Sequence, residues 1–441
     1  MSQNAPDTVP RLRACDPPGT RRPSWLETLT DLAFVVILGQ LVSRLLAAPG
    51  GAAVFDLLLL VVPVWWLWNG LTFYTNRFAV VNDLGDFLFT VVQLLGLLVL
   101  AVVIKLALTS HTNTVIFVGI YAGLRGVVHV QYARVAHFVP AARAYVRHVQ
   151  VGFAVSLACW VGAALAEAPV GYYLWALALA AEICTPLVAG GRALHQHIPP
   201  DARHLPGRVA TFVLLVLGQV AHGITQGLSQ TGLNADGLGR ALLAGGTLIG
   251  LGGAYFTRVY EAPVQALSER KRTAPFWTWA YLHLPLTLFL LLGSAGLTLA
   301  VDEKPEVALT SWLVGGGVGG SYLVMGLLGI VNSWASEQAQ PGARRRVALR
   351  LVAGGCLLLA ASWASPLLLL LLGAATGLGI VLQDYFGPLA PVTGFPTIAS
   401  RYTHEPKQNS SHGSGPQPGS APAKPAVPEQ ETPWAVYQEK A

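Results

Sequence analysis

Long runs of apolar residues alternate along the chain with short polar segments. Each run is near the length of about 20 residues that an α-helix needs to cross the hydrocarbon core of a bilayer. The runs lie at 29–47, 53–72, 87–108, 113–132, 150–167, 171–190, 208–228, 238–256, 276–300, 307–331, 348–362 and 364–382. The pattern predicts an all-α polytopic membrane helix bundle with about 12 transmembrane helices. The last two runs are short, so a single re-entrant or tightly turned pair is an alternative for them.

Polar segments flank this apolar body at both ends of the chain. Residues 1–24 contain four arginines, and no short apolar stretch with a small-residue cleavage site follows them. We therefore expect a polar cytoplasmic tail rather than a signal peptide. Residues 397–441 are rich in Pro, Ser, Gly and Gln. Such a segment buries too little apolar surface to offset the entropy of ordering, which predicts a disordered cytoplasmic tail.

The composition also indicates a membrane protein. Only 11% of the 441 residues are charged and 53% are hydrophobic, whereas soluble domains carry about 25% charged residues. The four cysteines lie far apart, which excludes a disulfide scaffold and the Cys/His spacing of a zinc site. The formal charge of +6 is compatible with nucleic acid binding, so the positions of the basic residues decide what it means.

Basic residues are unevenly distributed over the two predicted sides of the membrane. With the N-terminus in the cytoplasm, cytoplasmic segments hold 23 of the 28 Lys and Arg residues and external ends hold four, while Arg125 lies inside the fourth run. Cytoplasmic loops of membrane proteins carry such an excess. We therefore expect a multi-pass protein of the cell (inner) membrane with both termini in the cytoplasm and no nucleic-acid partner.

Two short motifs recur in the second half of the chain. Residues 36–41 read VILGQL and residues 215–220 read LVLGQV, while FYTNR at 73–77 corresponds to YFTR at 255–258. Two ordered matches at nearly the same offset predict similar six-helix halves at 25–190 and 208–385, joined by a cytoplasmic linker at 191–207. An even number of helices gives both halves the same orientation in the membrane. Chance similarity between apolar runs is the alternative.

Ionisable side chains lie within the apolar runs, where each needs a partner or water because a charge in a bilayer is costly. They are the candidates for an ion or proton pathway: Glu27, Asp31, Arg125, Glu182, His222 and His283. Structural alternatives exist for all of them. Glu27 suits the first turn of a helix, Arg125 and Glu182 suit a structural ion pair, and the two histidines suit interhelical hydrogen bonds.

Aromatic and glycine clusters have simpler interpretations. Trp65, Trp66 and Trp68 are typical of an aromatic belt at the membrane surface. The spacing of Gly315, Gly317 and Gly320 matches a dinucleotide-binding motif, but it falls inside an apolar run with no strand before it. Close packing of two helices is the better interpretation of these glycines.

No motif in the chain predicts catalysis or a cofactor. Three loop histidines, His195, His197 and His204, lack a fourth ligand and a fixed spacing, so we predict no metal. The chain has no nucleophile-elbow, phosphate-loop or zinc-protease motif. We therefore expect no cofactor and no enzyme activity.

Several segments, in order, resemble the bacterial low temperature requirement A family. They are WLETLTDLAFV at 25–35, WWLW at 65–68, YTNRF at 74–78, HLPGR at 204–208, LGQ at 217–219, YF at 255–256 and YLHLPL at 281–286. The resemblance covers about 25–290 and implies a multi-spanning membrane protein related to growth in the cold. It implies no particular biochemical activity.

The chain departs from the family pattern at several acidic positions. Gln219, Thr257 and Ala79 stand where the family has acidic residues, and Gly207 replaces the Glu that precedes the motif arginine. The matching motif residues include Glu27, Asp31, Arg77, Arg208 and His283. If the lost carboxylates carry the family activity, this member is altered in that activity or inactive.

We expect an ion, a proton or a small solute to move along a polar path between the two halves. Asp31 and Glu182 would be carboxylate sites, with Arg125 as their counter-charge and Glu27 at the cytoplasmic mouth. The alternative is a non-transporting protein, either a lipid-related enzyme or a structural component that supports growth at low temperature. Membrane lipids are the expected partners, and the sequence does not predict the oligomeric state.

Overall fold

The computed structural model describes most of the apolar body of the chain. The described residues are 10–12, 24–79, 84–167, 169–188, 194–202, 204–257, 261–302, 307–337 and 342–386. The predicted disordered tail at 397–441 and most of the predicted N-terminal tail at 1–24 lie outside these residues.

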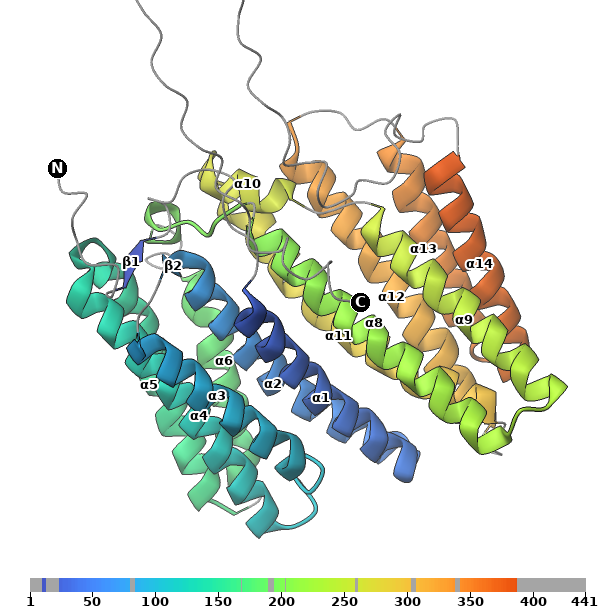
Figure 1. Cartoon of the computed structure of the whole chain (residues 1–441), viewed down its shortest axis with the longest axis horizontal. Coiled ribbons are helices and arrows are strands. Elements are labelled where there is room, and N and C mark those ends of the chain that lie inside the picture. Colours follow the sequence, from blue (N-terminus) through green and yellow to red (C-terminus); the bar gives the residue numbers. More distant parts are fainter. Residues whose placement is uncertain are drawn as a thin grey trace, which may run out of the picture. The chain divides into compact units, whose positions relative to one another are not determined.

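Helices make up nearly all of the described chain (Figure 1). The first series is α1 (Trp25–Ala47), α2 (Gly51–Arg77), α3 (Leu84–Val103), α4 (His111–Phe138), α5 (Arg143–Leu165) and α6 (Val170–Cys184). The second is α8 (His204–Thr231), α9 (Ala235–Phe256), the short α10 (Ala262–Ser268), α11 (Thr273–Asp302), α12 (Val307–Ala335), α13 (Ala343–Ala360) and α14 (Pro366–Phe386). The 3-10 turn η2 (Pro140–Ala142) directly precedes α5, and the 3-10 turn η3 (Thr185–Leu187) directly follows α6. Strands β1 (Arg11–Leu12) and β2 (Phe78–Ala79) form one antiparallel pair.

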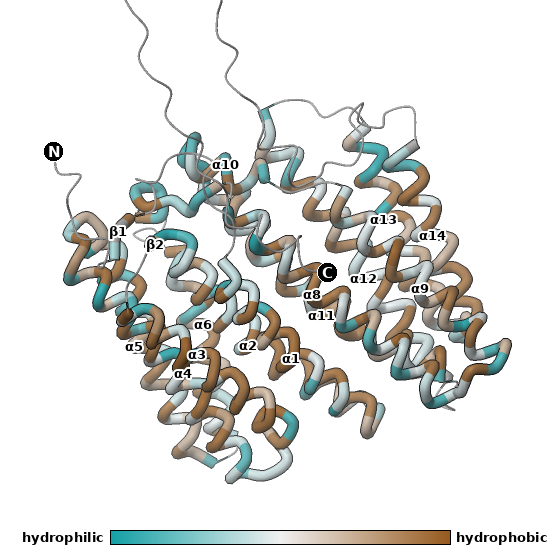
Figure 2. Tube along the Cα trace, viewed as in Figure 1, coloured by the Kyte–Doolittle hydropathy of each residue, from teal (hydrophilic) through white to brown (hydrophobic). Residues whose placement is uncertain are grey.

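The predicted all-α polytopic membrane bundle is confirmed. Every predicted run coincides with a helix of its own, and ten helices of the described chain are long and apolar enough to cross a membrane. Of the twelve helices that coincide with predicted runs, α9 and α13 are outside this group of ten. Helix α13 has four arginines among its first eight residues. The last two runs form two helices, α13 and α14, with a turn between them. Figure 2 shows apolar residues along the helices and polar residues concentrated near their ends.

Several predicted boundaries are wrong, because helices continue beyond their apolar runs. The helix predicted at 150–167 begins at Arg143, and α4 extends to Phe138 rather than 132. Helix α8 begins at His204, inside the predicted linker 191–207. Helix propensity does not require apolar residues, so a polar turn extends a helix that packing already holds.

Most helix contacts of the first series have a counterpart in the second, and the close packing of α9 on α14 is the main exception. In the first series α1 contacts α2 and α3, and α3, α4, α5 and α6 then pack each on the next. In the second series α8 contacts α9 and α11, and α11, α12, α13 and α14 pack each on the next. The two series meet where α1 and α2 contact α8 and α11. This contact places the start of α1 beside the start of α8.

Glycines allow the closest helix contacts, as the sequence predicts for the glycines of α12. A Cβ atom on Gly317 would lie 2.2 Å from the backbone nitrogen of Gly293, so α11 and α12 touch backbone to backbone. In the same way a Cβ on Gly250 of α9 would lie 2.2 Å from the Cα of Gly377 of α14. Small residues at helix contacts let van der Waals packing hold helices together in lipid.

The predicted aromatic belt is wrong. Trp65, Trp66 and Trp68 are buried within the protein. Trp68 stacks on Phe212 of α8 with ring centroids 4.1 Å apart, and Trp66 packs against Tyr281 of α11. These residues belong to the contact between the two series, because a run of large aromatic side chains can fill an interhelical space as well as a membrane surface.

Candidate functional site

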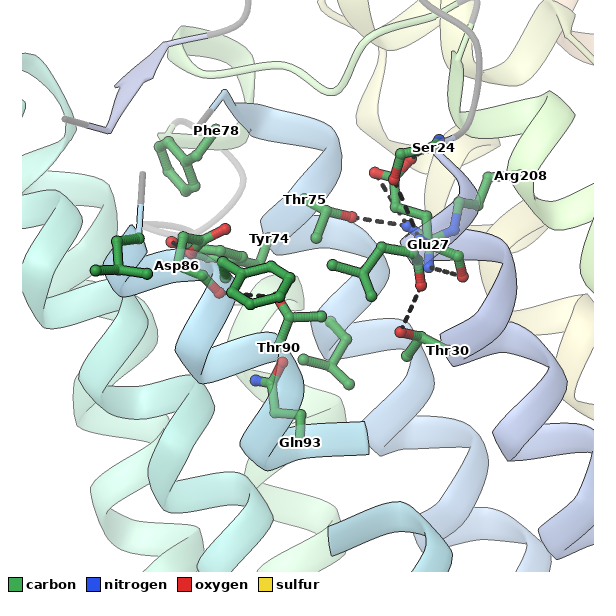
Figure 3. A pocket seen from close by; sticks show the side chains of 14 residues that line it. Ser24, Glu27, Thr30, Tyr74, Thr75, Phe78, Asp86, Thr90, Gln93 and Arg208 are labelled. Atoms are coloured by element: carbon green, nitrogen blue, oxygen red, sulfur yellow. Dashed lines mark hydrogen bonds and ion pairs between the residues drawn. The ribbon is translucent and has the colours of Figure 1, made fainter. Parts of the chain in front are cut away.

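A polar pocket of about 550 Å³ lies at the start of α1 and α3 and the end of α2 (Figure 3). Arg208 of α8 closes one side of it, and Figure 3 shows polar groups on two opposite walls. The polar residues that line it are Ser24, Glu27, Thr30, Tyr74, Thr75, Asp86, Thr90, Gln93 and Arg208. Its size and mixture of polar and apolar walls are those of a small-molecule site.

The first wall is an ion cluster that joins α1 to α8. The Arg208 guanidinium donates to both carboxylate oxygens of Asp31, from Nη2 at 2.8 Å and from Nε at 3.1 Å. Its Nη1 lies 3.3 Å from the Glu27 carboxylate and donates to the Thr75 hydroxyl at 2.8 Å. The Trp68 indole donates to Asp31 at 2.8 Å. Two carboxylates and one arginine are therefore buried together, with Asp31 fully engaged in a bidentate pair.

Local helix signals place this cluster. Ser24 caps α1, because its hydroxyl accepts from the Glu27 backbone while the Glu27 carboxylate accepts from the Ser24 backbone. This capping box fixes Glu27 in the first turn of α1, and Asp31 follows on the same face one turn later. Arg208 lies one turn into α8, four residues after His204. His204 itself lies 3.4 Å from the Glu27 carboxylate.

The end of α2 holds a second layer of buried polar groups. The Asn76 amide contacts the His204 ring at 3.1 Å and accepts from the Asp201 backbone at 2.8 Å. Arg77 donates to the Ile198 carbonyl at 3.1 Å, and its Nη2 lies 2.9 Å from Nδ1 of His195. Residues that the sequence flagged as motif positions therefore tie α2 to the segment between the two helix series.

His195 is held neutral by its surroundings. Burial lowers the pKa of His195 well below the ordinary 6.5, and the positive charge of Arg77 lowers this pKa further, with a smaller contribution from His148. The guanidinium can only donate, so Nδ1 of His195 accepts the hydrogen bond and carries no proton. The ring also lies against Tyr145 and Trp277.

The opposite wall of the pocket holds groups that the sequence did not single out. The Asp86 carboxylate accepts from the Tyr74 hydroxyl at 3.0 Å and from the Gln131 amide at 3.3 Å. Gln131 in turn accepts from Gln93 at 2.6 Å. Asp86 lies just outside the predicted run 87–108, and two glutamines inside apolar runs were the signal that could have drawn attention to this wall.

Deeper in the first series lies a separate ion pair between α4 and α6. The Nε of Arg125 donates to Glu182 at 3.1 Å, and both side chains are buried. Glu182 also accepts from the hydroxyls of Ser156 and Tyr121. The guanidinium lies over the Phe153 ring, with its carbon 4.3 Å from the ring centroid.

The predicted counter-charge of Asp31 is therefore wrong. Arg125 pairs with Glu182 as expected, but Asp31 pairs with Arg208, a residue that the sequence identified only as a family-motif position. Arg208 and Asp31 are far apart in the chain and meet only because α1 packs on α8. Asp31 does not line the pocket, whereas its partner Arg208 and the neighbouring Glu27 do.

The remaining candidates lie elsewhere. His283 is buried, with Nδ1 2.8 Å from the Trp279 carbonyl and Nε2 3.1 Å from the Tyr255 hydroxyl. The contact with Trp279 lies within α11, and the contact with Tyr255 is a hydrogen bond between α11 and α9. His222 is exposed on α8, outside the ion clusters. Gln219 is half-buried at the contact of α8 with α1, where its side chain lies against Gly39.

A third ion cluster lies in the second series, at residues that the sequence did not single out as site candidates. Arg350 of α13 pairs with Asp384 of α14 and donates to the Ala254 carbonyl of α9 at 2.9 Å. Thr257, at a position where an acidic residue was expected from the family pattern, donates to Asp384 at 2.9 Å. Arg350 and Asp384 lie near the ends of apolar runs, and a charged residue at such a position is expected in a loop outside the membrane.

The loop histidines do not converge. His204 contacts Asn76 and Glu27, His195 contacts Arg77, and His197 is exposed. Within the residues that the structure describes, no group of three or more His, Cys, Asp or Glu side chains is arranged to hold a metal ion.

Comparison with known proteins gives one match. The family model described as "Bacterial low temperature requirement A protein (LtrA)" matches residues 22–383. Neither the curated proteins nor the solved structures contain a match to the chain. The matched range begins just before α1 and ends at residue 383, so it includes the first two ion clusters and Arg350 of the third, whereas Asp384 is the first residue after it.

Proposed function

Since the chain belongs to the bacterial low temperature requirement A family, we propose that it moves an ion, a proton or a small polar solute across the membrane. The observation that carries this proposal is the polar pocket of about 550 Å³ at one end of the membrane helices. A cavity lined by carboxylates, hydroxyls and amides is costly to keep inside an apolar helix bundle, which is why such groups mark solute or ion pathways in membrane proteins.

Polar groups continue from the pocket into the first helix series. Gln93 lines the pocket and donates to Gln131 of α4. Arg125 lies six residues before Gln131 on the same helix, about 9 Å deeper at 1.5 Å per residue. Arg125 and Glu182 then form a buried ion pair. The proposed path therefore follows α2, α3 and α4 within the first half, beside the contact with α8, rather than the middle of the contact between the halves.

The Asp31–Arg208 pair has a place in this proposal as a link between the halves. Arg208 contacts the pocket residue Glu27 and the buried Asp31 at the same time. A proton or cation at Glu27 would weaken its attraction to Arg208, and the change would be felt at the contact of α1 with α8. A solute in the pocket could in this way shift the two halves relative to each other, as alternating access requires.

Topology and symmetry belong to the same proposal. Most helix contacts of the first series have a counterpart in the second, although α9 packs closely on α14 and α2 does not do so on α6. The recurring motifs fall at equivalent places, inside the first helix and at the end of the second helix of each series. This supports two similar halves of common orientation.

Segments assigned to the cytoplasm also meet, since Arg77 contacts Ile198 and Lys271 contacts Gln196. We propose that this end faces the cytoplasm of a bacterial inner membrane.

A flux measurement tests the proposed function. Purified protein in liposomes is assayed for the movement of H⁺, K⁺, Na⁺ and anions, with Asp31→Asn as the site variant. We expect a flux for the natural protein and a lower flux for Asp31→Asn, because asparagine leaves the Arg208 charge without its bidentate partner at the contact of α1 with α8. Absence of any flux across the whole panel would contradict the proposal.

Two further variants guard against a merely misfolded Asp31→Asn protein. Trp68→Phe keeps an aromatic ring beside Phe212 and removes the hydrogen bond to Asp31 together with part of a buried ring, while both charges of the pair stay, so it should fold and reduce the flux less strongly. Asp236→Asn removes an exposed ion pair with Arg240 at the other end of α8 and α9 and should leave the flux unchanged. Equal fluxes from all three variants would show that the Asp31–Arg208 pair has no role in the flux.

A second candidate function is a non-transporting role with membrane lipids as partners. Two apolar residues of α3 at the pocket, Leu84 and Phe87, are 69% and 47% exposed, so this side of the pocket opens toward lipid. A lipid-related enzyme or a structural component would use such an opening. This candidate predicts no flux, together with lipid that copurifies with the natural protein and is lost when Phe87 is replaced by Ser.

A further inference from the structure

The arginine of the α4–α6 ion pair has hydrogen-bond donors without acceptors. Arg125 is 4% exposed, and its Nε is the nitrogen that donates to Glu182. Its two terminal nitrogens, Nη1 and Nη2, are buried and have no partner among the residues that the structure describes. Buried charged donors are almost always paired in native proteins, so this edge of the guanidinium calls for an acceptor.

Other buried arginines do not share this property. All three guanidinium nitrogens of Arg208 have partners. Arg77 lacks a partner at one terminal nitrogen, and Arg350 lacks one at Nε. Within the described chain, these three arginines each keep at least two nitrogens engaged, whereas Arg125 presents both terminal nitrogens. That edge of a guanidinium is the planar fork that matches a carboxylate or another oxyanion with two parallel hydrogen bonds.

Gly70 of α2 and His129 of α4 lie near this end of Arg125. The α2 backbone comes close to the fork at Gly70, since a Cβ there would lie 2.8 Å from Nη1 of Arg125. His129, one turn further along α4, lies against the same Phe153 ring as the guanidinium. Its Nδ1 is buried and has no partner among the described residues, so it is a second donor or acceptor on this side. Glu182 accepts from three side chains, and it meets the Arg125 guanidinium at Nε and not at the two terminal nitrogens.

We propose that the Arg125 fork binds a small oxyanion of the carboxylate type, with His129 as a second contact. The proposal rests on the proposed function for its route and deepens it by naming the charge of the solute. Glu182 holds the guanidinium through Nε, and the ligand adds to the other edge without displacing Glu182. The carboxylates of the pocket, Glu27 and Asp86, would then exchange protons at the entrance rather than hold the ligand.

Binding is tested separately from transport. The purified full-length protein in detergent is unfolded by heat while chloride is replaced stepwise by formate or nitrate, two small planar oxyanions, at constant sodium concentration. We expect a saturable rise in Tm. Arg125→Lys should bind formate about tenfold or more weakly, because an ammonium cannot form the bidentate pair and tenfold corresponds to about one charged hydrogen bond.

A glycine pair supplies a variant that keeps every charge. Gly70→Ala should also weaken formate binding, since the new methyl group would displace Nη1, the flexible end of a side chain that can move without unfolding the helices. Gly126→Ala, with nothing within 4 Å of its new methyl group, should bind formate like the natural protein. The absence of a saturable rise, or the same formate affinity in the natural protein and in Arg125→Lys, would overturn the oxyanion site and leave water as the acceptor.

The two proposals fail in different ways. Saturable formate binding that Arg125→Lys weakens, in a protein that moves nothing across liposomes, would support the oxyanion site and contradict the transport function. Movement of cations alone, without formate binding, would contradict the oxyanion site and support transport.

Discussion

At the scale of single residues, nearly every ionisable candidate inside a span is held by partners. Asp31, Glu182 and Asp384 each pair with an arginine from another helix. Removing one member of such a pair leaves an uncompensated buried charge and costs about 3–5 kcal/mol, whereas replacing both by apolar groups is often neutral. Each of the three pairs therefore joins two helices, and any function must operate without leaving one of these buried charges unpaired.

The buried His195 makes stability depend on pH. Its pKa is lowered in the folded protein, so the unfolded chain binds a proton below about pH 6.5 that the folded protein does not bind. Stability is complete above pH 6.5 and falls as the pH decreases below it. Between pH 7 and pH 5.5 we expect a loss of about 1 kcal/mol from this residue, measured by unfolding in detergent.

Two histidine variants isolate this effect. His195→Gln removes the titrating ring, so its stability should fall by about 1 kcal/mol less than that of the natural protein over the same pH range. His197→Gln changes an exposed histidine two residues away and should follow the natural protein. An identical pH dependence for His195→Gln and the natural protein would show that His195 does not stay neutral when the chain folds.

At the scale of helices, close contact through glycine is the main device of the second series. The backbones of α11 and α12 touch at Gly293 and Gly317, and those of α9 and α14 touch at Gly250 and Gly377. Lipid tails are as apolar as leucine, so a helix contact in a membrane gains from close packing rather than from removal of apolar surface from water. The glycines therefore act as positions of contact and not as breaks in the helices.

A methyl group at one of these contacts should separate the helices. Gly317→Ala places a Cβ 2.2 Å from the Gly293 nitrogen, a backbone atom that cannot move aside. We expect a destabilisation of about 1–3 kcal/mol, the usual cost of overpacking, seen as a lower Tm in detergent. Gly316→Ala is the matched control, because its nearest neighbour would lie at 4.0 Å, and a Tm loss as large as that of Gly317→Ala would refute the packing argument.

At the scale of the whole molecule, the two helix series meet through α1 and α2 on one side and α8 and α11 on the other. The Asp31–Arg208 pair and the stack of Trp68 on Phe212 both lie at this contact. The pocket is beside it, lined mainly by the first series but closed by Arg208 of the second. A relative movement of the halves would therefore change the shape of the pocket.

Cysteine labelling tests the orientation of the molecule. In a background with the four natural cysteines replaced by serine, Asp236→Cys lies at the exposed start of α9 and Glu269→Cys at the exposed turn after α10. The positive-inside rule predicts that a membrane-impermeant maleimide labels Asp236→Cys in intact cells and Glu269→Cys only after permeabilisation. Labelling of both positions from the same side would contradict the even alternation of the spans.

The sequence by itself determined the class of fold and the existence of a helix at each apolar run, of which ten are long and apolar enough to cross a membrane. A run of about 20 apolar residues has few alternatives to a membrane helix, since every backbone group must be satisfied within the segment. The order of the short motifs along the chain was also enough to identify the family, because these motifs extend over most of the membrane helices. Among the polar candidates, the pairing of Arg125 with Glu182 was foreseen, since both lie well inside apolar runs and have opposite charge.

Only the tertiary structure decided which polar groups share a site. Asp31 meets Arg208, and Asp86 meets Gln131, through contacts between helices that are distant in the chain, and no local pattern encodes these distances. The same is true of the tryptophans, which form an interior contact and not a surface belt. A periodic pattern states how apolar a helix is, but the face of the helix that meets protein rather than lipid is set by its neighbours, because in a bilayer both surroundings are apolar.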